Sequence, residues 1–184
     1  LFSHSAEPKG VPVVTFAARL LKDKGIEDFI EAAKILKQRC IAAKFWIAGE
    51  VDQGNLSSIS PIKIDKWKSE SYLTFLGHQE DISKIYSQSH IICLPSYREG
   101  LPKSLIEGAA SGRAIVTTNV PGCKDAIIPG KTGILVPPQN PNLLAKALEE
   151  LILDPQKRSL MGKEGRKLAC QAFSIHKVIN DHFD

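Results

Sequence analysis

The sequence predicts an α/β domain of the Rossmann-like kind, with about six parallel strands in a sheet between two layers of helices. Two observations carry this prediction: short apolar runs alternate with longer stretches of helical period, and the apolar runs contain almost no charged residues. The length agrees, because 184 residues suit one domain with a sizeable core. We therefore expect residues 1–184 to form a single unit.

Six segments have the composition of buried strands. They are Val11–Ala17, Lys44–Ala48, Tyr72–Leu76, Ile91–Leu94, Ala114–Thr117 and Gly133–Val136. Lys44, at the start of the second segment, is the only charged residue among them. Strands this apolar are typical of a parallel sheet that is covered by helices on both faces.

Helices are predicted between and after these strands. The first is indicated by apolar residues at helical spacing, namely Ile26, Phe29, Ile30, Ala33 and Leu36. Others are expected over Pro61–Lys68, Pro141–Leu153 and Gln156–Ala172, and a further helical pattern begins in Ser174–Asp184. Ser60 and Asn140 hold the N-cap positions before two of these helices. The polar segment Gly49–Ile59 is predicted to be a loop.

Composition limits the classes of function. A formal net charge of +4 suits an anionic ligand or an anionic membrane surface, but it is too small to indicate nucleic acid. The four cysteines are widely spaced, which predicts neither a zinc site nor a redox pair and favours reduced thiols in the cytoplasm. No apolar run approaches the roughly 20 residues that cross a bilayer. Because the chain begins without an initiator Met, we expect it to be part of a longer protein.

The segment richest in chemistry is 95–112, directly after the fourth predicted strand. Ligands of open α/β sheets bind beyond the carboxyl ends of the strands. Pro102 suits the first position of a helix, and a diphosphate is favoured by the free N–H groups that follow it, those of Lys103, Ser104 and Leu105. Gly100 would let the backbone approach that ligand closely.

Two glutamates frame the start of this predicted helix. Glu99 lies in the loop and Glu107 lies eight residues later, in the second turn, so they can contact different parts of one ligand. Ser104, Glu107 and Ser111 share a face of the helix. The alternative is that Glu107 belongs to the solvated helix surface, as most helical glutamates do. Spacing alone leaves both readings open.

The segment resembles the E-x7-E signature of the retaining glycosyltransferases of family 4, which have the two-domain GT-B architecture. The resemblance implies that Glu99 contacts the donor sugar and that Glu107 binds the ribose hydroxyls. The family's R-L-x(n)-K-G motif, whose Arg and Lys bind the diphosphate, is matched by Arg19-Leu20 and Lys24-Gly25. A guanidinium and an ammonium can neutralise a diphosphate from one side, although each alone would be read as a surface charge.

Further stretches resemble the family in the same order along the chain, namely Ile47–Glu50, Phe75–His78, Pro121-Gly122 and Gly133–Pro138. The resemblance implies catalytic roles for Glu99, Arg19 and Lys24. The donor-binding set that it implies is Arg19, Lys24, His78, Gly100, Leu101, Pro102, Lys103, Ser104 and Glu107. Relatives place the nucleotide base near the loop after the third strand, which holds His78. The short polar stretch Val51–Lys68 departs from the family, whose members often carry a longer helix there.

The resemblance also implies a role for the whole chain, as the C-terminal, nucleotide-sugar-binding domain of a glycosyltransferase. The N-terminal acceptor domain is expected before Leu1, and the chain alone is expected to be inactive. The implied donor is a nucleotide-diphosphate sugar, with UDP favoured, and the implied acceptor is a bacterial surface polysaccharide or a lipid-linked saccharide. Transfer would retain the configuration of the sugar. We expect a cytoplasmic protein that in full-length form associates with the inner face of the cytoplasmic membrane.

Other nucleotide sites are disfavoured, and neither a metal nor a cofactor is expected. Gly130-Lys131-Thr132 mimics the end of a P-loop, but Asp125 stands where the first glycine of that motif belongs. The first strand is not followed by G-x-G-x-x-G, and D-x-D is absent, which argues against a dinucleotide and against a metal-held diphosphate. Two alternatives stay open: a non-catalytic nucleotide-sugar-binding module, and an epimerase with the GT-B fold.

Overall fold

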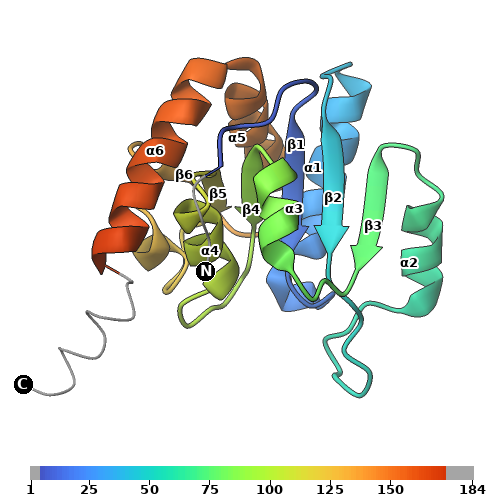
Figure 1. Ribbon diagram of the computed structural model, residues 1–184. Helices are drawn as coiled ribbons and strands as arrows, with labels where there is room; N and C mark the ends of the chain where they lie inside the picture. The colour runs from blue at the N-terminus through green and yellow to red at the C-terminus, as the bar shows by residue number, and fades with distance from the viewer. Residues whose placement is uncertain (1–4, 173–184) are drawn as a thin grey trace, which may run out of the picture.

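The computed structural model describes residues 5–172 and contains one six-stranded sheet in which all neighbouring strands are parallel (Figure 1). The strands are β1 (Val13–Ala17), β2 (Lys44–Ala48), β3 (Leu73–Gly77), β4 (Ile91–Leu94), β5 (Ala114–Thr118) and β6 (Gly133–Val136). Their order in the sheet is β3-β2-β1-β4-β5-β6. The direction of winding therefore reverses between β1 and β4, which is where open α/β sheets bind ligands.

Helices cover both faces of the sheet, which confirms the predicted Rossmann-like three-layer architecture. α1 (Ile26–Gln38) and α5 (Pro141–Leu153) pack together on one face, and α3 (Ile82–Gln88), α4 (Lys103–Ala110) and α6 (Pro155–Ala172) lie on the other (Figure 1). α2 (Pro61–Lys68) lies beside the edge strand β3. Two 3-10 turns, η1 (Lys22–Lys24) and η2 (Lys124–Ala126), interrupt the loops after β1 and β5.

Buried phenylalanines join the first helix to the sheet. Phe29 of α1 lies between Phe16 of β1 and Phe45 of β2, with ring centroids 5.5 and 6.0 Å apart. Aromatic pairs of this kind contribute about 0.5–1.5 kcal/mol beyond the burial of their area. These contacts fix the position of α1, and with it the position at which the loop between β1 and α1 leaves the sheet.

The predicted strands are confirmed with small shifts at their ends. β1 begins at Val13 rather than Val11, because its ladder with β2 starts at Val13 and Val11 is 46% exposed. β3 ends one residue later than predicted, since Gly77 still pairs with Ala48 across an irregularity in the ladder. The predicted loop Gly49–Ile59 holds neither a helix nor a strand. The pattern in Ser174–Asp184 lies outside the described residues.

One helix of the structure, α3, is not predicted from the sequence. α3 has seven residues and buries only Tyr86, so its apolar stripe is too short to reveal a period. Its N-cap Asp81, which accepts a hydrogen bond from the Ser83 amide at 3.2 Å, is the signal that could have found it. Ser60 holds the predicted N-cap position of α2 but forms no side-chain cap bond, whereas Asn140 caps α5 as predicted.

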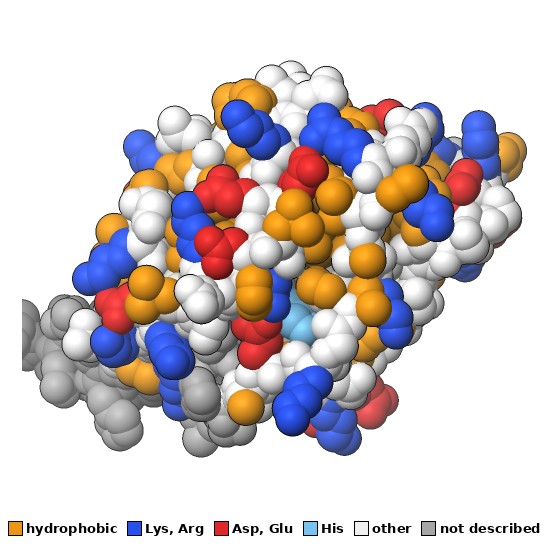
Figure 2. Space-filling model, turned by 90° about the horizontal axis from the view of Figure 1, so that it is seen from above, with side chains coloured by type: hydrophobic (Ala, Val, Ile, Leu, Met, Phe, Trp, Pro, Cys, Tyr) orange, Lys and Arg blue, Asp and Glu red, His pale blue; other side chains and the backbone are white. Residues whose placement is uncertain are grey.

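The amino ends of the strands form the face of the domain that lies opposite to the carboxyl ends, where ligands are expected. Figure 2 looks onto this face and shows Lys and Arg side chains interspersed with Asp, Glu and apolar ones. Beneath it, the buried Arg113 donates from Nε to the carbonyl of Tyr86 at 2.9 Å and from Nη2 to that of Ser5 at 3.1 Å. The mixed charges of this face do not favour a polyanion.

Candidate functional site

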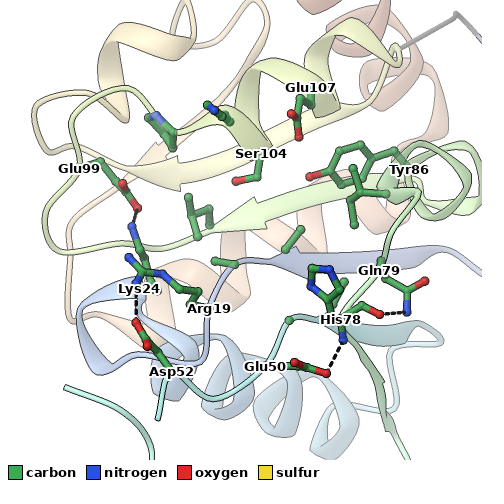
Figure 3. A pocket seen from close by; sticks show the side chains of 18 of the residues that line it. Arg19, Lys24, Glu50, Asp52, His78, Gln79, Tyr86, Glu99, Ser104 and Glu107 are labelled. Atoms are coloured by element: carbon green, nitrogen blue, oxygen red, sulfur yellow. Dashed lines mark hydrogen bonds and ion pairs between the residues drawn. The ribbon is translucent and has the colours of Figure 1, made fainter. Parts of the chain in front are cut away.

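A cavity of about 750 Å³ opens at the carboxyl ends of β1 and β4, at the reversal point of the sheet (Figure 3). Its walls come from α3, α4 and the loops that follow β1 to β4. The predicted site residues that it brings together are Arg19, Lys24, His78, Glu99, Leu101, Pro102, Lys103, Ser104 and Glu107. Gly100 does not line it. Ligand pockets typically measure about 300–1,000 Å³, so the cavity suits a ligand of nucleotide size.

One wall of the cavity, the basic wall, consists of Lys24 and Arg19, and both are ion-paired with carboxylates. Nζ of Lys24 lies 2.6 Å from Oε1 of Glu99, and Nη1 of Arg19 lies 2.5 Å from Oδ2 of Asp52. The first pair is largely buried, with side chains 21% and 10% exposed, whereas Arg19 is 62% exposed. Figure 3 shows the four side chains along one side of the cavity, with the two cations side by side between the carboxylates of Glu99 and Asp52.

Backbone packing holds the two loops of this basic wall together. Gly25 ends the η1 turn with a φ of 71°, in the left-handed region that favours glycine. A Cβ atom on Gly25 would lie 2.0 Å from the carbonyl oxygen of Pro95, so only glycine allows the approach. Beside this contact, the Tyr97 amide donates to the Asp23 carbonyl at 2.8 Å. The loop that carries Lys24 is therefore fixed against the loop after β4.

The amino end of α4 forms the floor between the walls, and α4 begins one residue later than predicted. Pro102 is its N-cap with an extended backbone, not its first helical residue. The Leu105 amide donates to the Pro102 carbonyl at 3.1 Å, so the prediction that it is free is wrong. Among the described residues, no acceptor is found for the amides of Lys103 and Ser104. These two amides and the positive end of the helix can bind an anion.

Glu107 lies on the wall opposite the basic one, near Tyr86 and Ser104 (Figure 3). Burial raises the pKa of the Glu107 carboxyl, and the charge of Lys103 offsets this only in part. Burial and the nearby Glu107 charge also raise the pKa of the Tyr86 phenol above its usual range. Glu107 is half-buried, unlike the solvated surface residue of the alternative reading. Its carboxylate is suited to accept hydrogen bonds from ligand hydroxyls.

The third wall follows β2 and β3. The His78 amide donates to Oε1 of Glu50 at 3.2 Å, and Nε2 of Gln79 donates to the Leu76 carbonyl at 2.7 Å. Figure 3 shows His78 between the side chains of Glu50 and Gln79. These bonds hold the loop after β3 at the mouth of the cavity. The structure thus places His78 where the sequence predicts it and adds two polar neighbours.

Four lining residues with polar side chains are not predicted from the sequence, namely Glu50, Asp52, Gln79 and Tyr86. Glu50 directly follows Gly49 at the end of β2, so its position beyond a strand could have found it. Tyr86 belongs to the unpredicted α3. Asp52 stands in a polar loop that looks like ordinary surface. Its contact with Arg19 joins positions 33 residues apart, and no local pattern reveals such a contact.

Three further properties of the described residues bear on the chemistry. Within residues 5–172, no three His, Cys, Asp or Glu side chains are grouped so that they could hold a metal ion. No helix of that part of the chain is long and apolar enough to cross a bilayer. All four cysteines are free thiols, with Cys93 and Cys123 buried and Cys40 and Cys170 exposed.

Comparison with known proteins assigns the chain to a family. The model of the family described as glycosyl transferases group 1 matches residues 1–168. The chain belongs to this family. The resemblance of the sequence to glycosyltransferases of the GT-B architecture is thereby confirmed.

Two of the curated relatives illustrate the similarity, and both come from bacteria. The capsular polysaccharide biosynthesis glycosyltransferase CapM of Staphylococcus aureus is 29% identical over 162 residues, which is 88% of this chain and 42% of CapM. The N,N'-diacetylbacillosaminyl-diphospho-undecaprenol alpha-1,3-N-acetylgalactosaminyltransferase of Campylobacter jejuni is 32% identical over 160 residues, 87% of this chain and 40% of that protein. The chain thus spans about two fifths of the length of these relatives.

Solved structures of other proteins share the fold of this chain. The sucrose-phosphate synthase of Thermosynechococcus elongatus superposes with a TM-score of 0.86 at 25% identity, covering 99% of this chain and 48% of the synthase. HepE of Anabaena, solved in complex with UDP, superposes with a TM-score of 0.82 at 22% identity, covering 93% of this chain and 47% of HepE. At such identity HepE is evidence for the fold only.

Proposed function

We propose that residues 1–184 form the donor-binding, C-terminal domain of a retaining glycosyltransferase that takes a sugar from a UDP-sugar. One observation carries the proposal: Arg19, Lys24, the amino end of α4 and Glu107 all line one cavity at the reversal point of the sheet. The positive groups suit a diphosphate, and a carboxylate on the opposite wall suits the ribose hydroxyls. Membership of the glycosyl transferases group 1 supports glycosyl transfer as the reaction class.

In this proposal the nucleoside diphosphate is the leaving group. Lys24, Arg19 and the free amides of α4 stabilise the negative charge that grows on it as its bond to the sugar breaks. Glu99 contacts the donor sugar, and its bonds with Lys24 and with Oγ of Ser96 at 2.7 Å hold it in place. The protein's own cations and a helix end neutralise the diphosphate, so we propose that no metal is required.

The base and the acceptor are placed by the remaining geometry and by the relatives. We assign the nucleotide base to the third wall, beside His78. The basic wall is assigned to the diphosphate and the wall that carries Glu107 to the ribose, so the third wall is left for the base. The names of CapM and of the Campylobacter enzyme describe work on a capsular polysaccharide and on a lipid-linked saccharide. By analogy the acceptor is a saccharide of one of these kinds, bound by a preceding N-terminal domain at the membrane surface. The chain alone then binds the donor without transferring its sugar.

The first expected result concerns binding without metal. UDP should bind the chain with nearly the same affinity in Mg²⁺ and in excess chelator, because the positive potential comes from the basic wall and α4. Isothermal titration calorimetry in the two buffers measures this, with ADP and GDP as controls for the base. Failure of every nucleoside diphosphate to bind would refute the donor site, and a tenfold or greater loss in chelator would refute the metal-free mechanism.

The reaction itself needs the full-length protein. Incubated with UDP-sugars and with soluble and lipid-linked saccharides, it should yield a glycosylated acceptor that retains the donor's configuration. An epimerase would instead release a changed or free sugar without any acceptor. A binding module would yield no product at all while still binding UDP.

A further inference from the structure

A short polar loop supplies the cavity with a carboxylate that the proposed function does not use. Asp52 lies between β2 and α2. Its Oδ2 forms the ion pair with Nη1 of Arg19, and Nδ2 of Asn55 approaches the same oxygen at 3.4 Å. Asp52 is therefore ion-paired with Arg19, a cation that the proposed function assigns to the diphosphate.

Hydrogen bonds within the loop hold Asp52 in position. Its carbonyl accepts from the Asn55 amide at 3.1 Å and from Oγ of Ser58 at 2.6 Å. The Ser57 amide in turn donates to Oδ1 of Asn55 at 2.9 Å. Side-chain bonds of this kind are typical of compact turns, and they leave the Asp52 carboxylate at the surface of a preorganised loop.

The same loop is bonded to the segment that follows Arg19. The Leu20 amide donates to the Glu50 carbonyl at 2.9 Å, and the Ile59 amide donates to the Leu20 carbonyl at 3.1 Å. The ladder continues with a bond from the Lys22 amide to the carbonyl of Ser57, at 2.8 Å. The backbone on both sides of Asp52 is thus tied to the backbone beside Arg19. The ion pair therefore forms between two segments whose backbones are joined.

A diphosphate in the cavity has to share Arg19 with this carboxylate. Asp52 holds Nη1 of the guanidinium, so a phosphate reaches the full set of Arg19 N–H groups only when the Arg19–Asp52 ion pair is broken. Lys24 is less affected by Asp52 because its own counter-ion is Glu99. Asp52 therefore opposes the part of the ligand that carries charge, and leaves the nucleoside untouched.

We propose that Asp52 is a positioning residue that holds Arg19 at the rim of the cavity as an internal counter-ion and so lowers the affinity for the diphosphate. The inference rests on the proposed function, because it takes Arg19 to be a diphosphate ligand. A substitution at Asp52 should therefore have the opposite effect on affinity to a substitution of a residue that binds the ligand. Removing the charge of Asp52 strengthens binding.

Asp52→Asn tests this with the smallest change in shape, because the backbone bonds of the loop do not involve the carboxylate. The variant should bind UDP about two- to fivefold more tightly than the wild type, which is the range expected for losing an exposed ion pair. The gain should shrink as salt is added. Uridine, followed by NMR titration, should bind both proteins equally and so show that the pocket is intact.

The control compares proteins with and without Asp52→Asn in an Arg19→Gln variant, which lacks the cation that Asp52 pairs with. If Asp52 acts through Arg19, adding Asp52→Asn to that variant should leave UDP affinity unchanged. An equal gain in both backgrounds would assign the effect to the general charge of the loop and overturn the inference, as would unchanged or weaker binding by Asp52→Asn alone. A wild-type chain that binds no UDP would remove the proposed function and this inference together, whereas failure of the variant ratios alone leaves the proposed function standing.

Discussion

Glu107→Ala is expected to weaken UDP binding to the chain by at least about tenfold. Hydrogen bonds to a charged acceptor contribute about 1.5–3 kcal/mol each, so even one lost ribose bond has this effect on Kd. Calorimetry of UDP and of 2′-deoxy-UDP measures it. The wild type should discriminate against the deoxy ligand, which lacks one hydroxyl, and the variant should bind both alike. Equal affinity of wild type and variant for UDP would exclude Glu107 from the ribose site.

Glu107→Gln separates this loss from damage to the fold. Burial raises the pKa of the Glu107 carboxyl, so folding is favoured while that group is protonated and the contribution is lost as the pH rises through the raised pKa. At neutral pH the ionised Glu107 costs stability, and the glutamine variant should melt at or above the temperature of the wild type. It should nevertheless bind UDP more weakly, because a neutral amide is a poorer acceptor for hydroxyl groups.

The same raised pKa gives binding a pH dependence. A UDP-sugar, whose diphosphate takes up no proton in this range, should lose affinity as the pH falls through the pKa of Glu107. Because that pKa is raised, the loss should begin at a higher pH than an ordinary glutamate would give. Glu107→Gln should remove this dependence, and a wild-type affinity that stays flat through the acid range would contradict the role of the carboxylate.

The fold follows from local patterns wherever an element is long or strongly apolar. The apolar run Ala114–Thr117 and the capped, amphipathic segment Pro141–Leu153 each appear in the structure with at most one added residue. α3 is not predicted by local patterns, because seven residues with one buried side chain show too little periodicity. The ends of β1 and β3 shift because strand ends are set by the partner strand, as when Val13 pairs with Lys44, and not by the strand's own composition.

The site could be predicted to the extent that its residues sit beside recognisable signals. Glu99 and Glu107 flank a helix start after a buried strand, and both line the cavity. The ion pairs could not be predicted, because Lys24 meets Glu99, and Arg19 meets Asp52, only through the packing of distant loops. Each cation of the basic wall thus has a counter-ion within the protein.

Two glycines show the same difference between what a local sequence pattern indicates and what packing requires. Sequence reasoning singles out Gly100 as the place where the backbone approaches a ligand, and this stays a prediction. A Cβ on Gly100 would meet no protein atom within 4 Å, so the protein's own packing does not require glycine there. The demanding position is Gly122, which has a φ of 79° and lies against the Glu99–Gly100 backbone. A Cβ on Gly122 would lie 1.6 Å from the Gly100 carbonyl oxygen and 2.8 Å from that of Glu99.

Gly122→Ala is therefore expected to destabilise the chain by at least about 3 kcal/mol, by the sum of a backbone penalty and a clash. Gly130→Ala is the matched control, because Gly130 has a similar φ of 75° but open space where its Cβ would lie. The control should lose only about 1–2 kcal/mol, the cost of a left-handed residue other than glycine. Urea unfolding of the three proteins measures both values. The difference between them reports the clash with the Glu99–Gly100 backbone, so equal losses in the two variants would show that this loop yields easily and that Gly122 does not hold Glu99 at the cavity.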